Sequence, residues 1–147
     1  MTGTHTVRMA RPAARAGAYA AMAGIVLALA ATFLPWEQAG VRRSDFWHLG
    51  ASPGLSGDHG VYLLAAAMTL ILSVWALSYF AWRGTVGKAA WASGLFVGAA
   101  LLYGADLRVY TDLAASAHGL GEVVAAVGIT ALLAGSTLGL AARIAES

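Results

Sequence analysis

Two histidine–glycine pairs are the residues best suited to chemistry in this sequence. His59-Gly60 and His118-Gly119 each stand at the start of a long apolar stretch. An imidazole nitrogen can be an axial ligand of haem, and a following glycine leaves room for the porphyrin. If both stretches are helices that begin on the same side of a membrane, His59 and His118 are candidate ligands of a b-type haem. The alternative is that both are polar helix starts in the lipid headgroup layer, where histidine needs no partner.

A metal ion is a second possibility at the same end of the chain. His118 and Glu122 are four residues apart, so their side chains share one face of a helix. With His48 they form a candidate set of nitrogen and oxygen ligands that suits zinc or copper. Three acids on the same side are further ligand candidates: Asp58, Asp106 and Asp112. No complete metal-ligand motif is present, which weakens this hypothesis.

Glu122 carries the only charge inside the predicted membrane spans. An ionised side chain in a span is costly unless it is paired or hydrated, and such groups often carry protons or cations. Glu122 lies about one turn from the expected helix start, where a negative charge is also favoured by the helix N-terminus. This position favours a structural role, as a helix cap or as a partner of Arg108, over a transport role.

Composition limits the class of protein. Only 11% of the 147 residues are charged and 59% are apolar, whereas about 25% are charged in a typical soluble domain. A net charge of +2 leaves no basic stripe for nucleic acid. The absence of cysteine excludes thiolate ligands and disulfide exchange. No nucleotide-binding or hydrolase motif is recognised. We therefore expect an integral membrane protein that does not bind nucleic acid.

Four apolar stretches are long enough to cross a bilayer, which requires roughly 17–25 residues. They are residues 17–35, 61–82, 89–105 and 119–142. Because the stretches are continuous rather than alternating, they predict helices and not barrel strands. We expect an all-α fold: a single integral membrane domain over residues 1–147, built as a bundle of four transmembrane helices. The expected outer loops are residues 36–60 and 106–118.

The basic residues predict the orientation of these helices. Six lie on the side of the termini: Arg8, Arg11, Arg15, Arg83, Lys88 and Arg143. Three lie on the opposite side: Arg42, Arg43 and Arg108. Because cytoplasmic loops carry an excess of Lys and Arg, both termini are expected in the cytoplasm. The predicted location is the cell membrane, with a multi-pass topology.

Small residues recur at the spacing of one helix face. Gly128, Gly135 and Gly139 lie in the fourth predicted helix, and Gly94 and Gly98 lie in the third. Such residues let helix backbones approach closely and drive association within a membrane. In a chain rich in Ala and Gly the same spacings also arise by chance. The two His-Gly starts are, in addition, the pattern expected of two similar helical hairpins.

The exit from the first predicted helix, Leu34-Pro35-Trp36, is followed by a longer first outer loop and by the two His-Gly helix starts. In these features the chain resembles small uncharacterised four-span integral membrane proteins of GC-rich bacteria. The resemblance covers the topology of the whole chain. It implies neither an activity nor any site residue.

These features favour a non-enzymatic accessory or scaffold subunit of a membrane complex. No charge lies at the expected bilayer midplane, and the small-residue faces are suited to helix packing. The expected partners are the lipid bilayer and either other membrane protein subunits or further copies of the chain, with no cofactor. Two alternatives remain open: a membrane protein that binds b-type haem or a zinc or copper ion, and a small oligomeric transporter.

Overall fold

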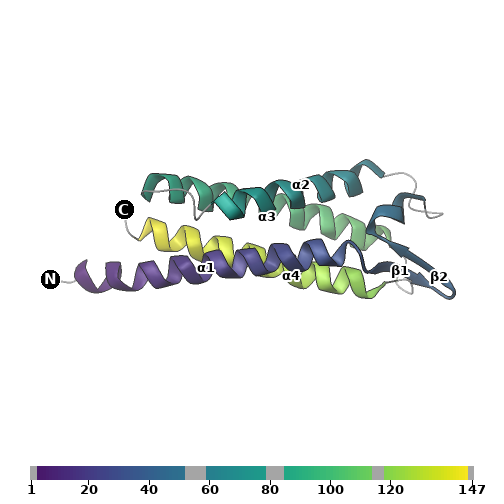
Figure 1. Cartoon of the computed structure of the whole chain (residues 1–147), viewed down its shortest axis with the longest axis horizontal. Coiled ribbons are helices and arrows are strands. Elements are labelled where there is room, and N and C mark those ends of the chain that lie inside the picture. The colour runs from purple at the N-terminus through teal and green to yellow at the C-terminus, as the bar shows by residue number, and fades with distance from the viewer. Residues whose placement is uncertain (1–2, 52–58, 79–84, 114–117, 146–147) are drawn as a thin grey trace.

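The computed structural model describes residues 3–51, 59–78, 85–113 and 118–145. These residues form four long α-helices that run along the longest dimension of the molecule (Figure 1). They are α1 (Gly3–Ala31), α2 (His59–Ser78), α3 (Thr85–Asp112) and α4 (Leu120–Ile144). Each helix packs against two others, in the cyclic order α1, α4, α3, α2. The first residues of α1 and the last residues of α4 lie at the same end of the bundle (Figure 1).

Three helical segments are long and apolar enough to cross a membrane: Pro12–Ala31, Gly87–Asp112 and Leu120–Ile144. In α2 the apolar segment found is shorter, Ala67–Ser78. The predicted helical architecture is confirmed, but the boundaries of the elements differ. The third helix was expected over residues 89–105 and instead runs to Asp112, so that half of the expected loop 106–118 is helical.

α1 and α4 are antiparallel and pack through small residues. A Cβ atom added to Gly128 would lie 2.7 Å from the carbonyl oxygen of Gly24, and one added to Gly135 would lie 2.6 Å from that of Gly17. The two backbones are therefore in direct contact, which is the close approach that small residues permit between membrane helices. Gly139 is packed less tightly, because its added Cβ would lie 3.5 Å from the nearest atom.

The glycines of α3 face large side chains of α2 rather than another backbone. A Cβ atom at Gly94 would lie 2.9 Å from the indole of Trp75, and one at Gly98 would overlap the side chain of Leu72. The indole nitrogens of Trp75 and Trp91 each donate to the backbone oxygen of the other residue at 3.0 Å. Gly94 and Gly98 thus accommodate the side chains that join α2 to α3.

The first outer segment contains a small β-hairpin, which the expectation of an all-α chain did not include. Strand β1 (Pro35–Ala39) pairs with β2 (Arg42–Asp45), and the 3-10 helix η1 (Phe46–Ala51) follows. Gly40 opens the two-residue turn with a φ of 64°, a conformation that favours glycine in hairpin turns. The sequence of β2 is polar and lacks the alternation of apolar and polar residues that predicts a strand. The hydropathy pattern therefore did not predict β2.

Candidate functional site

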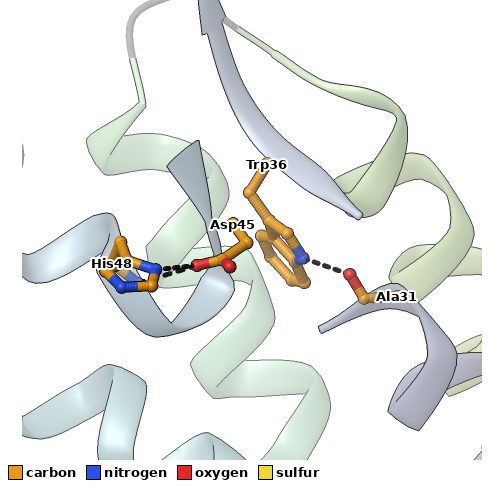
Figure 2. Close-up of polar contacts among 4 residues, drawn as sticks. All are labelled: Ala31, Trp36, Asp45 and His48. Atoms are coloured by element: carbon orange, nitrogen blue, oxygen red, sulfur yellow. Dashed lines mark hydrogen bonds and ion pairs between the residues drawn. The ribbon is translucent and has the colours of Figure 1, made fainter. Parts of the chain in front are cut away.

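Trp36 connects the hairpin to the helix bundle. The register of β1 shifts between Pro35 and Glu37, so Trp36 lies at a bulge, and its side chain is buried. Its indole Nε1 donates to the backbone oxygen of Ala31 at 2.7 Å, which satisfies one of the open carbonyls at the end of α1 (Figure 2). Its ring packs edge-on against Phe46, with centroids 4.8 Å apart. We call β1, β2 and η1 the outer cap.

The start of α4 is fixed against the outer cap at positions where only glycine fits. The backbone N–H of Gly119 donates to the carbonyl oxygen of Trp36 at 2.7 Å. A Cβ atom on Gly119 would overlap the carbonyl oxygen of Pro35, and one on Gly121 would lie 2.5 Å from the indole of Trp36. At Gly60, by contrast, an added Cβ would meet none of the described residues within 4 Å. The two His-Gly pairs therefore have different packing environments.

His118 and Glu122 lie together, as their spacing on one helix requires. The Nδ1 atom of His118 is hydrogen-bonded to Oε2 of Glu122. The imidazole also stacks on the ring of Tyr110 of α3, with centroids 4.7 Å apart and an interplanar angle of 20°. The side chain of Glu122 is only 6% exposed, whereas that of His118 is 24% exposed. The pair therefore extends from the surface into the bundle.

A second carboxyl group, that of Asp106, lies on α3 and is partly buried. Oε1 of Glu122 and Oδ1 of Asp106 are both buried, and neither has a hydrogen-bond partner among the described residues. A buried carboxylate oxygen without a partner is costly. Neither of the expected roles, a helix cap or an ion pair with Arg108, satisfies this oxygen of Glu122.

Asp106 also lines a cavity of about 20 Å³ between the four helices. Trp36 and Phe46 of the outer cap close one end of it, and Thr32 of α1 and Thr69 of α2 contribute hydroxyl groups. Each of these hydroxyls donates to a carbonyl oxygen of its own helix, at 2.7 and 2.8 Å. The cavity is large enough for about one water molecule. Its polar wall therefore offers hydrogen-bond acceptors.

The third predicted metal ligand, His48, does not join this group. Its Nδ1 atom lies 2.5 Å from Oδ1 of Asp45 in an exposed pair within the outer cap (Figure 2). In the described part of the chain, no three His, Asp or Glu side chains gather in a way that could hold a metal ion. The structure thus brings His118 and Glu122 together, and the described residues give the proposed zinc or copper site no third ligand.

The haem hypothesis gains no support from the described residues. His59 begins α2, but its side chain lies outside what the structure describes. The Nδ1 atom of His118 is bound to Glu122, and one face of its ring is covered by Tyr110. The cavity lined by Asp106 has a volume of about 20 Å³, far below the roughly 300–1,000 Å³ of sites for organic ligands.

Comparisons with protein-family models, curated proteins and solved structures gave no match. Function must therefore be argued from the residues themselves. In the sequence, Asp106 is only one acid among several, and Trp36 is part of the Leu34-Pro35-Trp36 exit from the first predicted helix. The signal for Trp36 was its position directly after Leu34-Pro35, where a helix ends and its carbonyls need donors. No local pattern revealed that Asp106 lines a cavity together with Trp36, because the two residues are far apart in the sequence.

Proposed function

We propose that this protein is a four-span integral membrane protein with both termini in the cytoplasm. Three segments of sufficient length and hydropathy support this topology, and the 20-residue α2 packs beside α1 and α3 as the fourth span. The start of α1 and the end of α4 lie at one end of the bundle (Figure 1). The sequence predicts the larger number of Arg and Lys residues on the side of the termini, as expected of a cytoplasmic side. The outer cap would then face away from the cytoplasm.

Within this topology, we propose a role as a non-enzymatic accessory or scaffold subunit of a membrane complex. The observation that carries the proposal is an exposed face of α3 that includes several small residues, which we call the α3 face. Its members recur at intervals of three and four residues: Ala90, Ser93, Val97, Ala100 and Gly104. The exposed side chain of Leu101 lies beside them. A Cβ atom added to Gly104 would meet nothing within 4 Å. No described part of the chain therefore packs against this glycine.

The other small-residue positions are already used within the molecule. Gly128 and Gly135 contact α1, and Gly94 and Gly98 contact α2. On α2 the exposed residues are mostly large and suited to lipid chains: Leu64, Leu70, Ile71, Val74 and Leu77. Small residues gain little against lipid but allow another helix to approach closely. The α3 face is therefore the surface on which we expect a helix of a partner subunit to pack.

The substitution Gly104→Leu tests this role. It would place a bulky side chain on the α3 face without touching the rest of the chain, so the melting temperature in detergent should stay unchanged while association is lost. Ala67→Leu, at an exposed position of α2, is the matched control. Association is measured by quantitative mass spectrometry of proteins that co-purify from native membranes, and by energy transfer between labelled copies in vesicles. Equal association of both variants with the unsubstituted protein would contradict the proposal.

A further inference from the structure

We propose that Phe33 and Trp47 anchor the outer cap in the headgroup layer of the bilayer, where their exposed rings contact lipid. The inference rests on the four-span topology proposed above. It starts from an aromatic pair at the point where α1 meets the cap. Phe33 is 75% exposed and Trp47 is 44% exposed, and their ring centroids are 6.4 Å apart. Exposed apolar groups that gather in this way mark contact with a membrane or with a partner protein.

The pair continues the exposed face of α1. Exposed residues recur along this face at intervals of three and four: Tyr19, Ala23, Val26, Ala30 and Phe33. The helical path reaches Phe33, because its N–H donates to the carbonyl oxygen of Ala30 at 3.2 Å. None of these five residues is charged. In the proposed topology this face meets lipid, and Trp47 extends it from the span onto the cap.

The length of the span places the pair at the edge of the hydrocarbon layer. The apolar segment of α1, Pro12–Ala31, has 20 residues. At a rise of about 1.5 Å per residue it is about 30 Å long, which matches the hydrocarbon thickness of a typical bilayer. Phe33 follows directly after this segment, at the depth where aromatic side chains are enriched in membrane proteins. The exposed polar residues Arg43 and His48 of the cap are suited to the hydrated side of the same layer.

Two further rings connect the pair to the core. Trp47 packs edge-on against Phe46 with centroids 6.2 Å apart, and Phe46 packs edge-on against Trp36 at 4.8 Å. Phe46 and Trp36 are buried, and Trp36 is hydrogen-bonded to the end of α1. The four rings therefore form a continuous row from the exposed surface to the junction with α4. Contact of Phe33 and Trp47 with the headgroup layer would hold the whole cap at one depth.

A partner protein is the alternative occupant of this surface, and the position of the pair favours lipid. The aromatic pair is continuous with a face that follows α1 through its span, and a helix in a bilayer exposes such a face to lipid. In the cyclic order of the bundle, α1 and α3 are not neighbours. A subunit packed on the α3 face would therefore leave the exposed face of α1 uncovered.

Spin labels on single cysteines test the anchor in phosphatidylcholine vesicles that contain the full-length protein. The chain has no cysteine, so labels can be placed one at a time at Phe33, Trp47, Val26 within the span, and Val41 at the exposed hairpin tip. A label in lipid collides more often with oxygen, and a label in water collides more often with a water-soluble nickel complex. The ratio of oxygen to nickel collisions should be several-fold higher at residues 33 and 47 than at residue 41.

The label at Val26 separates failure of the anchor from failure of the topology. A high ratio at residue 26, with ratios at residues 33 and 47 as low as at residue 41, would overturn the anchor and leave the topology intact. Few collisions with either reagent at residues 33 and 47 would mean that protein covers the pair, which also overturns the anchor. A low ratio at residue 26 would contradict the topology, and the anchor with it.

Tryptophan fluorescence tests the same contact with both rings in place. The difference in emission between the unsubstituted protein and Trp47→Phe reports Trp47 among the five tryptophans. In vesicles of phosphatidylcholine brominated near the glycerol end of its acyl chains, this difference should be quenched, whereas aqueous iodide should have little effect. Absence of quenching by the brominated lipid would contradict the anchor, whatever the effect of iodide.

Discussion

Gly119 shows how one residue fixes the junction between the outer cap and α4. Its N–H donates to Trp36, and the space that a Cβ would need is filled by the carbonyl of Pro35. Gly60 also follows a histidine at a helix start, yet no described residue lies where its Cβ would be. The sequence made these glycines look equivalent because it shows only their local context. What distinguishes them is a contact with a segment far away along the chain.

Gly119→Ala should therefore destabilise the protein, while Gly60→Ala should not. Overpacking against a fixed backbone costs about 1–3 kcal/mol, and the hydrogen bond to Trp36 would be strained as well. At Gly60, alanine enters open space in a helix and should stabilise by up to about 1 kcal/mol. Thermal unfolding in detergent, followed by circular dichroism, compares the two variants. Similar effects of both substitutions would contradict the junction described above.

The candidate site could be predicted only where its residues are close in sequence. His118 and Glu122 are four residues apart in one helix, and the structure pairs them. Asp106 lies on a different helix, and it lines the cavity beside Trp36 because α3 continues past the expected end of its span. His48 was grouped with them because it lies on the same side of the predicted membrane, which is too weak a constraint to bring side chains into contact.

At the scale of elements, hydropathy locates the helices but not their ends. The apolar stretch of α3 stops near Ala105, and the helix continues through polar residues to Asp112. Its outer turn carries Val109, whose burial against the bundle explains why helix packing extends beyond the apolar segment. The hairpin was missed because β1 and β2 are short, polar and stabilised mainly by their turn and by Trp36. Small residues line the interfaces between helices, as close packing of helices in a membrane requires.

The contact between α1 and α4 provides a test at this scale. Gly135→Leu would insert a side chain where an added Cβ already lies 2.6 Å from the carbonyl oxygen of Gly17. We expect destabilisation of about 1–3 kcal/mol or more, because two rigid helix backbones must separate. Ala134→Leu, the exposed neighbour on the same helix, is the control and should be nearly neutral. The measurement is the melting temperature in detergent. Equal melting temperatures for both variants would mean that the helices do not pack as described.

The whole molecule combines an apolar bundle with a polar cap at one end. The cap lies at the end of the bundle at which α4 begins, opposite the end with the start of α1 and the end of α4 (Figure 1). A membrane protein with this asymmetry exposes the outer cap to one compartment only. The orientation in the membrane therefore decides which solution the outer cap faces, and the positive-inside rule assigns the outer side.

Labelling of single cysteines tests that orientation in intact cells. The chain contains no cysteine, so each substitution introduces a unique reactive group. Val41→Cys, at the exposed tip of the hairpin, should react with a membrane-impermeant maleimide, whereas Ala145→Cys, after the end of α4, should react only once the cells are permeabilised. Labelling of both residues after permeabilisation shows that each thiol is accessible. The reverse pattern would place the outer cap on the cytoplasmic side. Labelling of both residues in intact cells would mean that the two ends of the bundle do not face opposite compartments.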